Sequence, residues 1–255
     1  MLTEPMFYAV ALPAVCLYGL SKGGFAGVSL LAVPLMSLVI SPVQAAAVLL
    51  PVLVVQDAVT VYAYRKSWDA TTLKVLLPGA LLGIGLGTLT AAFVTPDAIR
   101  LAVGLLAIAF CLNAWFGRQA AALEVQPHAM IPATVFGTLA GYSSFVIHAG
   151  GVPFNMYTLP RSASREVFVA TGGVFFALVN VIKIPPFFGL GQFSIANLIL
   201  SATLLPVAIA ANLAGIWLVR RLPTALFYKV IYGLTFLVGL KLASDGGSAL
   251  FLPPK

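Results

Sequence analysis

The stretch Ser21-Lys22-Gly23-Gly24 places a lysine beside two glycines within strongly apolar sequence, and His148-Ala149-Gly150-Gly151 places a histidine in the same setting. The two stretches lie about 127 positions apart, so a similar motif occurs twice in the chain. A charge in lipid is costly, and adjacent glycines free the backbone from a regular helix. Each stretch is therefore typical of an interrupted membrane helix whose polar groups line a cavity.

The composition around these stretches is that of a membrane protein. Hydrophobic residues make up 61% of the 255 positions and charged residues only 8%, whereas soluble domains are about one-quarter charged. The net charge of +7 would suggest nucleic acid for a soluble chain, but here the basic residues fall mainly between apolar segments. We expect a polytopic protein whose partners are the lipid bilayer and a small anion, with no nucleic acid and no removable signal peptide.

Apolar segments of membrane-spanning length follow along the chain. A hydrocarbon core of about 30 Å takes about 20 helical residues to cross. Segments 5–21 and 25–40, beside the first Gly-Gly pair, are marginal in length, and 152–160, after the second, is too short to cross. We expect an all-α protein with about eight to ten transmembrane or half-membrane helices, broken or re-entrant at the two glycine pairs. The full-length spans are 42–64, 73–94, 97–116, 129–147, 164–184, 193–219 and 224–244.

A second sequence pattern repeats with nearly the same shift. Leu76-Leu77-Pro78, followed by Gly87 and Pro96, recurs as Leu204-Leu205-Pro206, followed by Gly215 and Pro223. We therefore infer the duplication of a unit of roughly 125 residues. The chain divides into an N-terminal repeat 1–116, a linker 117–128 and a C-terminal repeat 129–255.

Basic residues between the spans predict how the two repeats are oriented. If each broken element counts as two pieces, each repeat has five pieces, and most basic loop residues fall on one side. Counting it as one crossing largely removes this asymmetry. The positive-inside rule favours the first count, with both termini outside and the repeats inverted. The residues on the cytoplasmic side are then Arg65, Lys66, Arg118, Arg161, Arg165, Arg220 and Arg221.

The interrupted segments carry the candidate binding residues. Helix ends leave backbone N–H groups without intrahelical partners, and their partial positive charge favours anions. Lys22 and His148 would add to this charge, and Ser144 shares a helix face with His148. The alternative is that Lys22 snorkels to an interface and His148 is a packing residue. The candidate substrate-binding residues are Ser21, Lys22, Gly23, Gly24, Ser144, His148, Gly150 and Gly151.

Asp57, preceded by Gln56, is the acidic residue that lies well inside an expected span. An intramembrane carboxylate is either a proton or cation carrier or a partner of Lys22, and the sequence leaves both roles open. Asn180 takes the matching place in the second repeat, and Lys183 follows one turn later. Lys183 is either a positive group of the site or a helix-end anchor before the proline pair that follows it.

Other motifs point to packing rather than to chemistry. Gly79, Gly83 and Gly87 repeat every four residues on one helix face, which indicates close helix packing. The chain contains no H-E-x-x-H, G-x-S-x-G or C-x-x-C motif. With two histidines and two cysteines, we expect no catalytic residues, no metal site and no cofactor.

The sequence resembles the TauE/SafE sulfite exporter family over almost its whole length. Many members look richer in glycine at both breaks, where this chain has Lys22, His148 and Ala149. The resemblance implies an inner-membrane anion carrier that is usually driven by the proton motive force. It rests on Gly19, Ser21 to Phe25, Val33-Pro34, Gly141, Ser144, His148 to Gly151, Pro153, Tyr157, Leu159-Pro160, Thr171, Phe175-Phe176, Asn180 and Lys183.

These features predict a secondary transporter that moves a small sulfur-containing oxyanion, sulfite or an organosulfonate, across the cell inner membrane. Alternating access of two inverted repeats, coupled to the proton motive force, is the expected mechanism. The alternative is an anion channel on the same scaffold, which would conduct without saturation. A membrane-embedded enzyme is disfavoured, because the sequence offers no nucleophile with a base.

Overall fold

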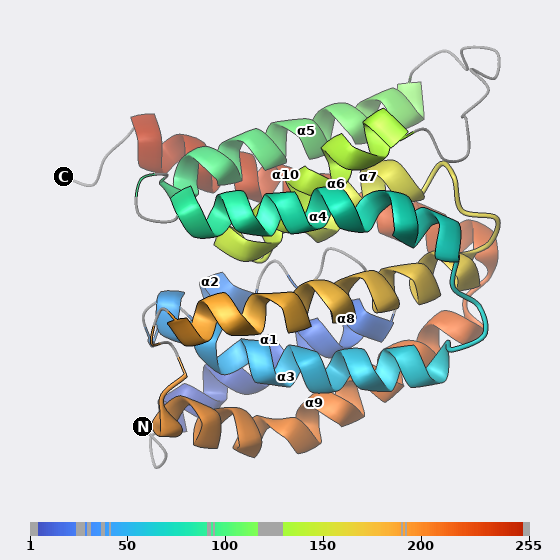
Figure 1. Cartoon of the computed structure of the whole chain (residues 1–255). Coiled ribbons are helices and arrows are strands. Elements are labelled where there is room, and N and C mark those ends of the chain that lie inside the picture. The colour runs from blue at the N-terminus through green and yellow to red at the C-terminus, as the bar shows by residue number, and fades with distance from the viewer. Residues whose placement is uncertain are drawn as a thin grey trace. The chain divides into compact units, whose positions relative to one another are not determined.

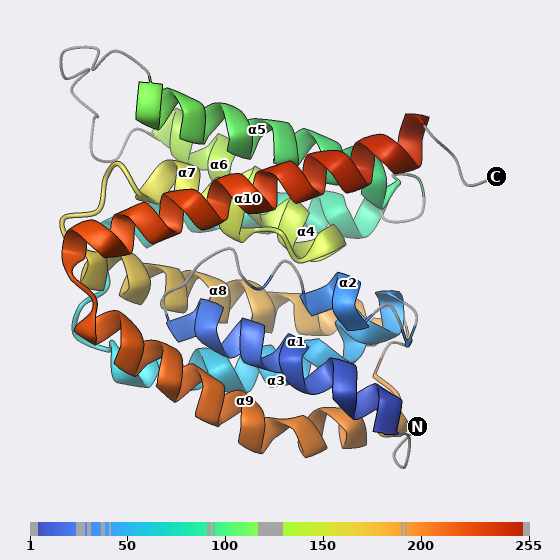
Figure 2. The same cartoon turned by 180° about the vertical axis from the view of Figure 1, so that it is seen from behind.

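The computed structural model shows a chain built of helices. It describes residues 5–23, 29, 32–36, 39–40, 42–90, 93, 95–116, 130–189, 191 and 193–251. Gly24, most of the expected segment 25–40 and the linker 117–128 lie outside these residues. Within the described part of the chain every regular element is a helix (Figures 1 and 2). The helices are α1 (Pro5–Gly23), α2 (Ala32–Met36), α3 (Pro42–Ala63), α4 (Ala70–Thr90), α5 (Pro96–Phe116), α6 (Met130–Ile147), α7 (Gly151–Thr158), α8 (Arg165–Gly189), α9 (Ile195–Arg221) and α10 (Thr224–Phe251).

Local capping chemistry accounts for several helix starts. Helices α1, α3 and α5 each begin with a proline, whose missing N–H costs nothing in a first turn. The Ser194 hydroxyl accepts a hydrogen bond from the Asn197 N–H at 3.1 Å before α9. The Asp69 carboxylate accepts one from the Thr71 N–H at 2.8 Å before α4. These side chains satisfy donors that the helix itself leaves open.

Among the residues that the structure describes, six helices are long and apolar enough to cross a membrane, namely α1, α3, α4, α8, α9 and α10. Helix α6 is apolar but shorter, and α7, with 8 residues, is far too short to cross. Many large apolar side chains on these helices are exposed, which suits lipid rather than water. The chain is therefore a multi-pass membrane protein.

The expected spans agree with the observed helices to within a few residues at most ends. The largest differences are at the end of α10, which continues to Phe251 instead of residue 244, and at the end of α8, which continues through Pro185 and Pro186 to Gly189 instead of residue 184. Proline usually ends or kinks a helix, but in membrane proteins neighbouring groups satisfy the freed carbonyls. Lys183 is fully buried within α8. The interpretation of Lys183 as a helix-end anchor is therefore wrong.

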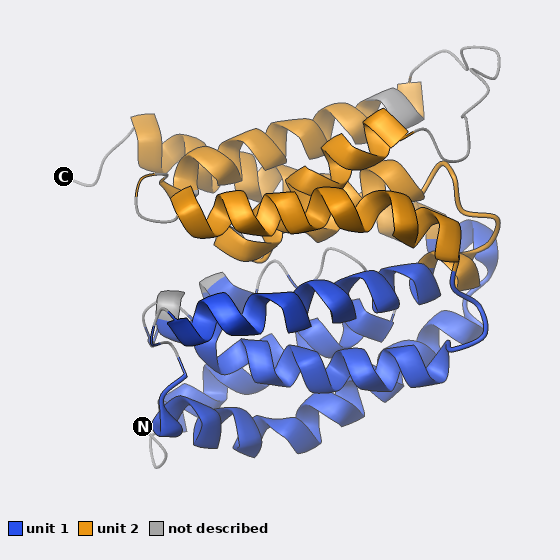
Figure 3. Cartoon of the chain, viewed as in Figure 1, with its two compact units in different colours: residues 1–68, 169–227 blue, residues 69–168, 228–255 orange. Residues whose placement is uncertain are grey.

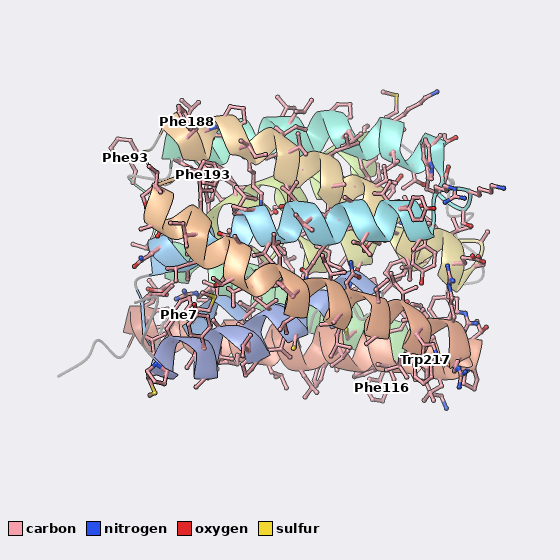
Figure 4. All side chains as sticks on the ribbon, turned by 90° about the horizontal axis from the view of Figure 1, so that it is seen from below. Phe7, Phe93, Phe116, Phe188, Phe193 and Trp217 are labelled. Carbon is pink, nitrogen blue, oxygen red and sulfur yellow. The ribbon has the colours of Figure 1, made fainter. Side chains whose placement is uncertain are left out.

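Exposed aromatic side chains lie toward opposite ends of the helices within each unit of the structure (Figure 4). Phe188 is near the end of α8, and Trp217 is on the last turns of α9. Phe93 lies between α4 and α5, and Phe116 ends α5. Trp side chains are enriched at the headgroup level of a bilayer, so the position of Trp217 near the end of α9 fits a helix that spans it.

The helices are divided between two compact units (Figure 3). Unit 1 comprises residues 1–68 and 169–227, and unit 2 comprises residues 69–168 and 228–255. Unit 1 therefore contains α1, α2, α3, α9 and most of α8, whereas unit 2 contains α4 to α7 and most of α10. Each unit takes helices from both expected repeats. The duplication itself stays a prediction.

In unit 1, α1 packs closely against α9 through small residues. A Cβ atom at Gly19 would come within 2.6 Å of the Ala211 Cβ, and one at Gly23 would overlap the backbone of Gly215. Small residues let two membrane helices approach at backbone distance. The apolar core beside this contact includes Phe7, Tyr18, Met36, Leu49 and Leu204.

In unit 2, α4 packs closely against α6 in the same way. A Cβ atom at Gly79 or Gly83 would overlap a carbonyl oxygen of α6, and one at Gly87 would come within 2.9 Å of the Phe145 ring. The glycines of α6 at 137 and 141 approach the backbone of α4 in return. The predicted packing role of the three α4 glycines is confirmed.

Candidate functional site

The first interruption lies at the C-terminal end of α1. Helix α1 ends at Gly23 and α2 begins at Ala32, so the helix stops at the expected glycine pair. Lys22 is in the last turn of α1, where the helix dipole favours a cation. The Ser21 hydroxyl donates to the Ser29 hydroxyl at 3.1 Å. This bond ties part of the chain after the interruption back to α1.

Lys22 forms an ion pair with Asp57 of α3. The side chain of Asp57 is 2% exposed and that of Lys22 is 11% exposed. The other carboxylate oxygen of Asp57 accepts a hydrogen bond from the Asn180 amide of α8 at 2.6 Å. The Lys22 amine also lies 5.2 Å from the centre of the Phe176 ring. One of the two roles left open for Asp57, pairing with Lys22, is thus present in the structure.

A second lysine belongs to the same group. Lys183 lies one turn after Asn180 on α8 and is fully buried. It interacts electrostatically with both Lys22 and Asp57. Burying an ammonium group is costly unless negative charge compensates it. Two lysines therefore share the negative charge of Asp57.

Gln56 connects α3 to its neighbours in unit 1. Its side-chain amide donates to the Ala208 carbonyl of α9 at 3.0 Å and lies 3.4 Å from the Val15 carbonyl of α1. The residue is fully buried. Its amide thus holds three helices together directly beside Asp57.

Sequence analysis missed Thr60 and Asn212, which are both fully buried. The Asn212 amide of α9 donates to the Gln56 carbonyl at 2.6 Å and to the Thr60 hydroxyl at 3.1 Å. The Thr60 hydroxyl also lies 3.3 Å from the Lys22 carbonyl. An asparagine in an apolar span and a threonine one turn after Gln56 are the signals that could have identified them.

Together these side chains form a buried polar cluster in unit 1. With both amines protonated, its two lysines and one carboxylate carry one net positive charge. Such an excess charge in a low-dielectric interior is offset by binding one anion. The polar cluster comprises Lys22, Gln56, Asp57, Thr60, Asn180, Lys183 and Asn212.

The second interruption lies between α6 and α7 in unit 2. Helix α6 ends at Ile147 and α7 begins at Gly151. His148 has a φ of 56°, in the left-handed region that non-glycine residues rarely adopt. The Ala149 N–H donates to the Ser143 carbonyl at 3.1 Å across this turn. The helix is therefore interrupted at the expected place, by a sharp turn at His148.

The glycines at the two interruptions have different surroundings. A Cβ atom at Gly151 would meet nothing within 4 Å, whereas one at Gly23 would overlap the backbone of Gly215. The substrate-binding role expected of both glycines stays a prediction, and the overlap at Gly23 shows that this residue has a packing role. That residue is required for the close contact between α1 and α9.

Helix α7 brings further buried polar groups to unit 2. The Asn155 amide lies 3.4 Å from the Thr235 hydroxyl of α10. The side-chain oxygen (Oδ1) of Asn155 and the Tyr157 hydroxyl have no hydrogen-bond partner among the described residues. The Arg161 guanidinium donates to the main-chain carbonyl of Tyr157 at 2.8 Å. Its central carbon lies over the Tyr157 ring, 4.2 Å from the ring centre. Ser144, near the end of α6, is also buried.

The expected substrate residues fall in both units. Those from 21 to 23, with the polar cluster, belong to unit 1, whereas Ser144, His148, Gly150 and Gly151 belong to unit 2. A cavity shared by the two interruptions stays a prediction. Among the described residues, no group of three or more His, Cys, Asp or Glu side chains is placed to hold a metal ion.

A family model supplies the identity of the chain. The model of the sulfite exporter TauE/SafE matches residues 11–242, which include both interruptions and the whole polar cluster. No curated protein and no solved structure shows a significant match. The matched region covers nearly all of the chain and agrees with its apolar helices. The chain therefore belongs to the TauE/SafE family of membrane sulfite exporters.

Proposed function

We propose that the protein is a secondary transporter that moves a small sulfur-containing oxyanion, sulfite or an organosulfonate, across the cell inner membrane. The family provides the class of substrate. The observation that carries the proposal is the pairing of Asp57 with Lys22, beside a second, fully buried lysine, Lys183, in the same polar cluster. Two buried lysines around one carboxylate favour binding an anion over binding a cation.

Symmetry between the repeats supports an alternating-access mechanism. Asp57 and Asn180 take matching places in the two repeats and are hydrogen-bonded to each other at 2.6 Å. Equivalent positions of two repeats can touch only near the axis that relates them. The contacts of α1 with α9 and of α4 with α6 also exchange under the same repeat. Substrate sites of inverted-repeat transporters lie at such repeat interfaces.

A contact in unit 1 supports the proposed orientation. The Arg220 guanidinium at the end of α9 donates to the Ala63 carbonyl at the end of α3, at 3.0 Å. The basic residues 65 and 66 therefore lie at the same end of unit 1 as 220 and 221. This agrees with counting each broken element as two pieces, which places these ends in the cytoplasm and both termini outside.

Asp57 is the proposed coupling residue. Both of its oxygens have a donor in the polar cluster, so a proton on Asp57 would weaken the contact with Lys22 or Asn180. Protonation would thereby change the charge of the site and the contacts between α1, α3 and α8. Replacing Asp57 with Asn should abolish pH-driven uptake and preserve exchange. Asp245→Asn is the control, because Asp245 pairs with Lys241 on the exposed face of α10.

Transport by purified protein in liposomes tests the function. We expect saturable counterflow of labelled sulfite that is lost in Lys183→Met and retained in Lys241→Met, since Lys241 is exposed and outside the polar cluster. Non-saturating conductance without counterflow would indicate a channel instead of a carrier. Failure of every sulfur oxyanion to exchange would reject the proposal.

A further inference from the structure

The charged residues of the polar cluster determine which anions it can bind. Its charged members are Lys22, Asp57 and Lys183, on α1, α3 and α8. The groups that α3, α8 and α9 add around them are the neutral side chains of Gln56, Thr60, Asn180 and Asn212. The charge of the cluster is therefore decided by two amines and one carboxylate.

The other acidic residues that the structure describes belong to unit 2, whereas these lysines belong to unit 1. Asp97 is in the first turn of α5 and pairs with Arg100, and Asp245 pairs with Lys241 on α10. Asp69 precedes α4, and Glu166 is in the first turn of α8, about five turns before Lys183. Asp57 thus provides the negative charge that the two lysines share.

The contacts of Asp57 are those of an ionised carboxylate. One oxygen is paired with the Lys22 ammonium, and the other accepts the Asn180 amide at 2.6 Å. Both neighbours are donors, and a carboxylate with two acceptor oxygens satisfies both. With this carboxylate ionised and both amines protonated, one unit of positive charge remains for a ligand.

We propose that Asp57 makes the polar cluster selective for the charge of the anion, so that it takes monovalent oxyanions, such as sulfonates and hydrogen sulfite, in preference to divalent ones. This inference rests on the proposed function of the cluster as an oxyanion site. A monoanion makes the occupied cluster electrically neutral. A dianion leaves one negative charge in a buried site, and buried net charge is costly. Lys22 is the more accessible of the two lysines, and its amine is the charge that the anion meets.

Asp57→Asn changes the charge of the cluster with little change in shape. The cluster then carries two positive charges, and its preference should shift toward dianions. The structure offers a matched control, because Asn180 faces Asp57 across a single hydrogen bond. The exchange variant Asp57→Asn/Asn180→Asp retains one acid and one amide at the same pair. It should restore the preference for monoanions.

Methanesulfonate and sulfate are suitable probes, because they have similar tetrahedral shapes but carry one and two negative charges at neutral pH. Each competes with counterflow of labelled sulfite through the purified full-length protein in liposomes. In wild type we expect methanesulfonate to inhibit at least about tenfold more strongly than sulfate, equivalent to about 1.4 kcal/mol. Asp57→Asn should move the ratio of the two inhibition constants at least about tenfold toward sulfate, and the exchange variant should return it.

Sulfate inhibiting wild type as strongly as methanesulfonate would overturn the inference, even if Asp57→Asn fails to fold. An unchanged ratio in a folded Asp57→Asn variant would overturn it as well, and so would inhibition by neither anion. In each of these cases sulfite counterflow remains intact, and the proposed function survives. Absence of sulfite counterflow in wild type would instead reject the proposed function.

Discussion

The ion pair between Lys22 and Asp57 should depend strongly on the other lysine of the cluster. Asp57→Asn leaves Lys22 and Lys183 together without their shared carboxylate, and we expect it to lower the free energy of unfolding by about 3 to 5 kcal/mol. Lys22→Met leaves Asp57 with Asn180 and Lys183, and it should cost only about 1 to 2 kcal/mol. The smaller cost also reflects the partial exposure of Lys22.

The double variant distinguishes this arrangement from an isolated salt bridge. In the Asp57→Asn background, Lys22→Met removes one of two mutually repelling cations, so it should be neutral or stabilising. We expect a coupling free energy of at least about 1 to 2 kcal/mol between the two sites. Unfolding in detergent micelles, followed by circular dichroism, measures all four proteins. The same cycle on the exposed pair Lys241 and Asp245 should give about 0.5 kcal/mol or less.

A single result would refute the reasoning. If Lys22→Met costs the same in both backgrounds, within about 0.5 kcal/mol, the two lysines do not share the carboxylate. The charge balance proposed for the anion site would then lose its structural basis.

Three further predictions concern the glycines and the orientation of the chain. Gly83→Leu should reduce the yield of folded protein because its side chain would overlap α6, whereas Gly85→Leu should not, since a Cβ atom there meets nothing within 4 Å; equal yields in size-exclusion chromatography would contradict this. Gly23→Leu should likewise prevent folding, but Gly151→Leu should fold and lose sulfite counterflow, and full transport by folded Gly151→Leu would exclude a substrate beside α7. A cysteine at Ala163, in a chain without its two natural cysteines, should resist an impermeant reagent added outside, and strong labelling would overturn the proposed orientation.

The positions of the helices and of both interruptions could be predicted from the sequence. A helix in lipid must satisfy its backbone hydrogen bonds within its own segment, so apolar length alone reveals the spans. Proline, glycine and polar residues then mark where the helix stops, as they do at Gly23 and before Gly151. The proline pair in α8 predicted a helix end that the structure does not show. Groups from neighbouring helices can support a helix that its own sequence would end.

The partners of the polar residues were decided by the tertiary structure. The sequence identified Lys22, Asp57, Asn180 and Lys183 as polar groups in apolar segments, but pairing of Lys22 with Asp57 was one of two open roles. Asn212 belongs to the same cluster and contacts Gln56 across 156 positions of the chain. Such contacts depend on which helices pack together, and helix periodicity contains no information about a distant partner.

The division into compact units also arises only in three dimensions. The predicted repeats follow the order of the chain, but α1 packs with α9 in unit 1 and α4 packs with α6 in unit 2. Small residues on a helix surface permit these close contacts. They do not specify which other helix packs against that surface. By itself, the sequence determined which segments form apolar helices and where those helices end, because those properties are local. Which charges share a buried site was decided by the packing of helices far apart in the sequence.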